Sequence, residues 1–277
     1  MPTIRYAALR HLYSWPYFRG RDRLIGWIVE TFAPQPVRLL DGLLMELDPS
    51  EWNQVELIAK GELEPVTLKR IRALMGEGDV MIDVGAHIGL HALTAARAAP
   101  TGRVLAIDPQ PYNIDRLARN ASWNGLANVE GICAAAGVED GFVRFLLQKA
   151  SDRSRLSLAL ANPNDLLVQI EVPMRRLDSI LGAQRVSRVR LLKIDVEGFE
   201  LEVLQGLGNR LGDCANVILE MLDDTPTERG TRVVQLLTGA GFALHDVEGR
   251  PWRAGEPLVE NNLWAFIPPD SPPDETH

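Results

Sequence analysis

The sequence predicts an α/β protein in which helices cover both faces of a mostly parallel sheet. Seven apolar segments have the length and composition of strands, helical segments separate most of them, and a glycine turn at 85–89 follows a buried strand. Such alternation favours parallel strands, because each helix carries the chain back to the edge at which the next strand begins. A chain of 277 residues suits one large domain with a small appendage.

The first sixty residues are predicted to form a cap or lid on the main domain. Residues 1–36 are rich in aromatic side chains, at spacings that indicate short amphipathic helices, and the same aromatics favour a homodimer surface as the alternative. A hairpin is expected at 39–47, where an Asp-Gly pair forms the turn, and a helix is expected at 51–59. The α/β region follows at 61–267.

The α/β region is predicted to begin with a helix and then to alternate. The expected helices are Pro65–Met75, Leu90–Ala99, Pro111–Asn124, Leu201–Leu207 and Thr227–Ala240, and the expected strands are Val80–Val84, Arg103–Asp108, Val129–Ala134, Val189–Asp195, Val217–Met221, Phe242–Val247 and Leu263–Ile267. The last strand follows its predecessor without a helix, so it is expected to run antiparallel. An inserted hairpin is expected at the rim of the sheet, at about 142–170, and the Pro- and acid-rich tail at 268–277 is expected to be disordered.

Charge and composition count against several classes of protein. Lys+Arg 29 against Asp+Glu 37 gives a net charge of −8, which argues against non-specific binding of nucleic acid, because phosphate neutralisation needs a basic surface. No apolar run is long enough for a membrane-spanning helix, and the N-terminus lacks the pattern of a signal peptide. Cys133 and Cys214 lie too far apart for a multi-thiolate zinc site and fit a reducing compartment, so we expect a cytoplasmic protein.

The strongest local motif is VMIDVGAHIGLHAL at 80–93, in which a buried strand ends at Asp83 and a turn uses Gly85 and Gly89. Its spacing, D-x-G-x-x-x-G, departs from the G-x-G-x-x-G of dinucleotide-binding proteins, which counts against an NAD-dependent oxidoreductase as the alternative function. An acid before the turn suits a cationic ligand better than a pyrophosphate. S-adenosylmethionine (SAM) is such a ligand, because it carries an ammonium and a sulfonium.

A second acid, Asp108, stands at the end of the next expected strand and precedes Pro109. An acid at this place accepts hydrogen bonds from both ribose hydroxyls of a nucleoside. Asp108 follows Asp83 by 25 residues, close to the spacing of about 20 expected of a ribose-binding acid. Each acid taken alone has an ordinary interpretation as a turn or helix cap. Their matched positions at two strand ends favour a SAM site.

A second motif, RLLKIDVEGFE at 190–200, places Asp195 at a strand end and Glu197 in the turn that follows. Acids grouped in this way are costly unless they are solvated or partnered. They either cap the next helix or face the methyl-transfer cleft, where they accept a substrate hydroxyl. Asp195, Glu220 and Asp223 also form a conceivable Mg²⁺ ligand set, although no metal is expected.

Together, DVGAHIG at 83–89 and LKIDVEGFE at 192–200 resemble the FkbM-type family of SAM-dependent methyltransferases. The resemblance extends from about Gly61 to Ile267. It implies a Rossmann-like, seven-stranded class I methyltransferase sheet. It also implies O-methylation of a small-molecule or saccharide hydroxyl, on a sugar, a glycoside or a secondary metabolite.

The resemblance also implies which residues bind the cofactor: Glu64, Asp83, Gly85, Ala86, His87, Gly89, Asp108, Pro109, Asn113 and Ala134. Two positions depart from the family pattern, which commonly has Asn where His87 stands and Glu where Asp108 stands. Aspartate keeps the bidentate acceptor, so the SAM prediction holds, whereas the contact made from position 87 stays open.

In-line methyl transfer needs the acceptor oxygen aligned about 3 Å from the methyl carbon and needs water excluded. A positioned base helps, because an aliphatic hydroxyl is weakly acidic. Asp195 is the first candidate for the base or orienting group and Glu197 is the second, with Glu220 near enough to join them. The remaining alternative is a SAM-binding protein without catalytic activity.

Overall fold

The fold is built around a seven-stranded sheet with the order β12-β13-β11-β10-β3-β4-β5. Its strands are β3 (Val80–Val84), β4 (Arg103–Asp108), β5 (Val129–Cys133), β10 (Leu191–Ile194), β11 (Asn216–Glu220), β12 (Ala243–Asp246) and β13 (Asn262–Phe266). The neighbours from β11 to β5 are parallel, and β13 is antiparallel to both β11 and β12. The predicted direction of the last strand is therefore confirmed. The computed structural model describes residues 11–12, 15–16, 18–20, 24, 34–49, 51–148, 156–157, 167–221 and 227–268.

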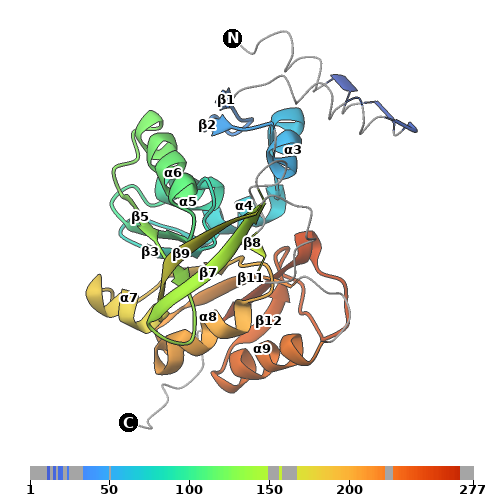
Figure 1. Ribbon diagram of the computed structural model, residues 1–277. Helices are drawn as coiled ribbons and strands as arrows, with labels where there is room; N and C mark the ends of the chain where they lie inside the picture. Colours follow the sequence, from blue (N-terminus) through green and yellow to red (C-terminus); the bar gives the residue numbers. More distant parts are fainter. Residues whose placement is uncertain are drawn as a thin grey trace.

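Helices cover both faces of this sheet, which confirms the predicted α/β class (Figure 1). One face carries α4 (Pro65–Leu74), α5 (Leu90–Ala98) and α6 (Pro111–Trp123), and the other carries α7 (Leu177–Ala183), α8 (Glu200–Leu207) and α9 (Glu228–Gly239). Two short 3₁₀ helices, η1 (Gly208–Asp213) and η2 (Val259–Asn261), lie in connections.

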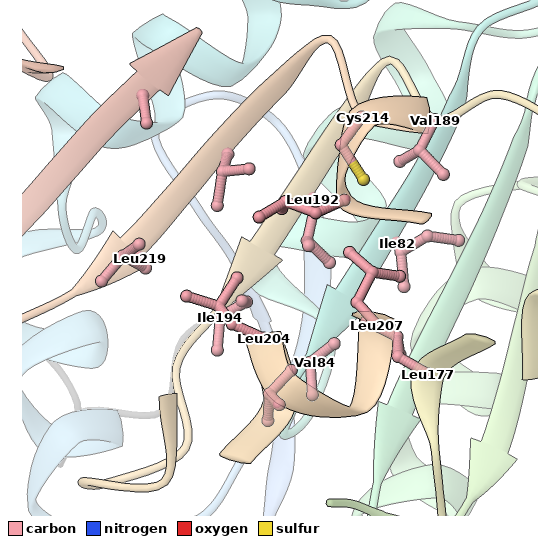
Figure 2. Close-up of a cluster of buried hydrophobic side chains, with 14 of the residues drawn as sticks. Ile82, Val84, Leu177, Val189, Leu192, Ile194, Leu204, Leu207, Cys214 and Leu219 are labelled. Atoms are coloured by element: carbon pink, nitrogen blue, oxygen red, sulfur yellow. The ribbon is translucent and has the colours of Figure 1, made fainter. Parts of the chain in front are cut away.

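Alternating residues of the central strands supply the two cores, because successive side chains of a strand point to opposite faces. Met81 of β3 lies in one core with Ile71 of α4, whereas Ile82 lies in the other with Leu204 of α8. Figure 2 shows this second core, in which apolar side chains of β3, β10 and β11 face those of α8. By the same alternation, Asp83 is on the face of α4 and α5.

A smaller sheet stands beside the carboxyl ends of the main strands (Figure 1). It has the order β6-β9-β7-β8, from β6 (Ala135–Ala136), β7 (Gly141–Gln148), β8 (Leu156–Ser157) and β9 (Leu167–Arg175). β7 and β9 pair antiparallel, in agreement with the expected hairpin, but β9 also pairs in parallel with β6, which directly follows β5. The hairpin therefore belongs to a separate sheet rather than to the rim of the main one.

The N-terminal part of the described chain packs on α6. The expected hairpin is present as β1 (Gln35–Arg38) and β2 (Leu44–Leu47), although its first strand begins earlier than predicted, and α3 (Trp52–Lys60) is the expected helix. The backbone N–H groups of Leu44 and Glu46 donate to side-chain oxygens of Asn124 and Asn120, at 2.9 and 2.8 Å. The helices expected within 1–36 fall mostly outside the described residues, as do residues 269–277 of the expected tail.

None of the helices in the described ranges is both long and apolar enough to cross a lipid bilayer.

Candidate functional site

A pocket of about 260 Å³ opens where the carboxyl ends of β3, β4, β5 and β10 meet. Each strand contributes the residues that follow it: Gly85 and His87, Asp108 to Gln110 with Asn113, Ala134 to Val138, and Asp195 to Glu197 with Phe199 and Glu202. Val143 and Phe145 of β7 and Met174 of β9 form an apolar wall. The two sequence motifs therefore line one cavity together.

The glycine turn is held against the second motif. Gly85 has φ of +81°, and a β-carbon built on it would stand 1.7 Å from the carbonyl oxygen of Asp195. The backbone N–H groups of Gly85 and Ala86 donate to the carbonyl of Ile107, at 2.9 and 3.0 Å. Only glycine meets both requirements, positive φ and absence of a side chain, so the motif needs its first glycine for packing.

Asp108 is 5% exposed and is placed by hydrogen bonds. Its Oδ2 accepts from the backbone N–H of His87 at 3.0 Å, and its Oδ1 accepts from the backbone N–H of Gln110 at 2.8 Å and from Asn113 Nδ2 at 3.0 Å. Burial raises the pKa of Asp108 despite these contacts. Because a carboxylate oxygen has two lone pairs, Oδ2 keeps the capacity to accept a hydroxyl of a ligand in the pocket.

Lys193 lies fully buried on β10, two residues before Asp195. Its Nζ is 3.5 Å from Asp195 Oδ2, and it faces Asp83 across the register between β10 and β3. Although burial opposes it, the negative charges of Asp195, Glu64 and Asp83 raise the pKa of Lys193. Lys193 is therefore a buried cation among carboxyl groups.

Glu64 and His91 form the neighbouring ion pair, with Glu64 Oε2 at 3.3 Å from His91 Nε2. Burial acts to raise the pKa of Glu64, but the charge and hydrogen bond of His91, with Lys193 and Asn262, bring it down to about 2. Asn262 Nδ2 donates to Glu64 Oε2 at 3.1 Å. Glu64 is thus a firmly ionised group beneath the glycine turn.

Two further carboxyl groups in this region hold their protons more tightly. Burial raises the pKa of Asp83 to about 6. Burial, followed by the charge and hydrogen bond of Asp195, raises the pKa of Glu220 to about 9. Glu220 is therefore protonated at neutral pH and donates to Asp195. Glu220 also lines a second pocket of about 190 Å³ between α8, α9 and the β12–β13 connection, so this carboxyl pair stands between the two cavities.

The structure brings most of the predicted site residues together. Gly85, His87, Asp108, Pro109, Asn113, Ala134, Asp195 and Glu197 line the larger pocket. Asp83, Ala86, Gly89 and Glu64 lie outside its lining, and their contacts with a cofactor stay predictions.

Sequence reasoning missed Lys193, His91 and the apolar wall. The alternation of FVRFLLQ at 142–148 puts Val143 and Phe145 on one side of β7, and this pattern was the available signal for the wall. Lys193 stands two residues before Asp195 and so shares its side of the strand.

Within the described ranges, no group of three His, Cys, Asp or Glu side chains is arranged to hold a metal ion. The alternative magnesium set included Asp223, which lies outside the described residues.

Comparisons with known proteins point to methyl transfer. The sequence profile of the Methyltransferase FkbM domain matches residues 83–244. The 31-O-demethyl-FK506 methyltransferase FkbM of Streptomyces tacrolimicus is 30% identical over 192 residues, which cover 60% of this chain and 74% of that protein. The hexuronic acid methyltransferase AglP of Haloferax volcanii is 29% identical over 153 residues, which cover 52% of this chain and only 56% of that protein.

Among solved structures, the precorrin-6y C5,15-methyltransferase of Geobacter metallireducens GS-15 is similar with a TM-score of 0.43 and 16% identity, over 76% of this chain and 88% of that one.

Proposed function

From the premise that this chain belongs to the FkbM methyltransferase family and has the class I methyltransferase fold, we propose that it methylates a hydroxyl group with SAM as the donor. The acceptor in this proposal is a sugar, a glycoside or a secondary metabolite. Support comes from the names of two relatives, one for 31-O-demethyl-FK506 and one for a hexuronic acid. The observation that carries the proposal is that Asp108 and Asp195, at the ends of β4 and β10, line one pocket.

The donor set of this pocket fits SAM. Asp108 offers a carboxylate to the ribose hydroxyls, and Ala134, Phe145 and Met174 offer apolar contacts to the adenine. At the other end, the three carboxylates of Asp195, Glu64 and Asp83 face two cations, Lys193 and the His91 that pairs with Glu64. This surplus of acids over bases favours a cationic ligand. When bound, SAM supplies a methyl group on a positively charged sulfur.

Asp195 is the proposed catalytic residue, because it lines the pocket and its surroundings fix its carboxyl group. Lys193 Nζ lies 3.5 Å from Asp195 Oδ2, and Glu220, on the adjacent strand, donates a hydrogen bond to Asp195. With these two groups in place, Asp195 accepts the hydrogen of the acceptor hydroxyl and orients the oxygen for in-line attack. Glu197 is the second candidate for this role. The side chains of Phe145 and Met174 exclude water.

A thermal-shift comparison tests the cofactor. S-adenosylhomocysteine (SAH) and SAM are expected to raise the Tm with concentration, because a ligand that binds only the folded state stabilises it by mass action, while NAD leaves the Tm unchanged. Stabilisation by NAD alone would favour the oxidoreductase instead.

The catalytic assignment is tested by Asp195→Asn beside Glu197→Gln, with mass spectrometry to detect methylated products from a panel of glycosides and hydroxylated macrolides. Asp195→Asn is expected to lower kcat by about 10²–10⁴-fold while SAH affinity changes little. Full turnover in Asp195→Asn with loss in Glu197→Gln would transfer the role to Glu197. Binding of SAH without any methylated product would favour the non-catalytic alternative.

A further inference from the structure

The ring of His87 connects the cofactor pocket to the N-terminal part of the chain. His87 lines the pocket beside Asp108, and its Nε2 lies 3.0 Å from Oε2 of Glu51. Glu51 precedes α3, in the segment 34–60 that packs on α6, and stands 36 residues before His87. A residue of the appended segment therefore touches the lining of the pocket directly.

The side chain of Glu51 is held in place by several hydrogen bonds. Its side chain is 1% exposed, and its Oε1 accepts from Arg116 Nη1 at 3.2 Å, while Gln54 Nε2 donates to Oε2 at 2.5 Å. Arg116 is itself fully buried, and its Nη2 donates to Gln54 Oε1 at 2.8 Å. A buried carboxylate with charged and amide partners has one geometry, so it can hold an imidazole in one orientation.

His87 is also constrained through its main chain. Its φ is +49°, in the left-handed region that residues other than glycine rarely adopt. Its backbone N–H donates to Asp108 Oδ2 at 3.0 Å. The ring contact with Glu51 and the backbone contact with Asp108 thus act on the same residue. The family pattern commonly has Asn at this position. The histidine side chain is longer than that of asparagine, so it extends as far as Glu51.

We propose that Glu51 is a positioning residue for the cofactor: through the ring of His87 it couples docking of segment 34–60 to cofactor binding. This inference rests on the proposed function, because the coupled ligand is SAM. Coupling between two sites is reciprocal, so the cofactor stabilises the docked segment to the same degree that the docked segment stabilises the cofactor.

A double-mutant cycle on SAH affinity, measured by calorimetry, tests the coupling. Glu51→Met and His87→Phe each keep the approximate size of the side chain and remove the hydrogen bond. Each substitution is expected to raise the Kd of SAH about tenfold. The double variant is also expected to have a Kd only about tenfold above that of the wild type, because the two substitutions remove the same interaction. Glu46→Met is the matched control. Glu46 also lies beside Arg116, at 4.0 Å, but it pairs with Arg119 rather than with His87, so this variant is expected to leave the Kd unchanged.

A second measurement covers the case in which Glu51→Met fails to fold. SAH is expected to slow hydrogen exchange of the α3 amides in the wild-type protein and not in His87→Phe. The proposal is overturned if the two single effects multiply to about a hundredfold in the double variant, if Glu51→Met binds SAH as the wild type does, or if His87→Phe keeps the protection of α3. Absence of SAH binding by the wild-type protein would instead contradict the proposed function.

Discussion

A β-carbon on Gly85 would stand only 1.7 Å from the carbonyl oxygen of Asp195. The turn after β3 and the end of β10 are therefore in backbone contact, and this contact brings the first motif and the proposed catalytic acid to one pocket. The close approach is possible because β3 and β10 are adjacent parallel strands, whose carboxyl ends lie at the same edge.

Gly85→Ala is the direct test of this contact. The substitution introduces both a clash with Asp195 and an L side chain at φ of +81°, so we expect it to lower the free energy of unfolding by about 3 kcal/mol or more and to abolish SAH binding. Urea unfolding and calorimetry measure the two effects. Gly182→Ala in α7 is the control, because a β-carbon there meets nothing within 4 Å. A Gly85→Ala variant as stable as the control would contradict the packing argument.

The central part of the fold could be predicted because its signals are local. β3 and β4 have the predicted bounds residue for residue, since each is a mainly apolar run with an acid at or next to its last residue and a turn after it. By contrast, β6 and β8 have two residues each and α7 has only seven, too short for a clear periodicity.

The polar contacts beneath the pocket could not be predicted from spacing. Lys193 meets Asp83 only because β10 inserts beside β3, and Glu51 meets His87 only because the segment before α3 packs on α6. Such contacts join segments that are distant in the sequence. Strand order determines the first of them, and packing against α6 determines the second.

Asp108→Asn tests the predicted ribose contact. Asparagine has one acceptor oxygen in place of two. If this oxygen accepts from the backbone N–H of His87 and from a ribose hydroxyl, the amide nitrogen stands in place of Oδ1 and cannot accept from the backbone N–H of Gln110. We expect the Kd of SAH to rise about 10- to 100-fold, the range for a hydrogen bond to a charged group. Calorimetry measures it beside Asp115→Asn, a substitution of an exposed acid in the following helix, α6. Equal affinities in the two variants would remove Asp108 from the cofactor site.

Glu64→Gln tests the ion pair with His91. The pKa of Glu64 is lowered from 4.5 to about 2, so its stabilising contribution is present above pH 4.5 and is lost as the pH falls towards 2. We expect Glu64→Gln to be less stable than the wild type by about 3 kcal/mol at pH 7, and the difference to shrink at pH 3. Urea unfolding at both pH values measures this, with the exposed Glu62→Gln as control. A difference that does not depend on pH would contradict the assignment.

Glu220→Gln tests the shared proton between Glu220 and Asp195. The pKa of Glu220 is raised from 4.5 to about 9, so its contribution to stability is full below pH 4.5 and is lost as the pH rises towards 9. Glutamine still donates to Asp195 but does not titrate. The variant should therefore gain stability relative to the wild type between pH 5 and pH 9, by at least about 1 kcal/mol, the equivalent of one pKa unit. Urea unfolding at pH 5, 7 and 9 measures the gain, and the exposed Glu228→Gln should show none. A constant difference across this range would mean that Glu220 is ionised throughout and donates nothing to Asp195.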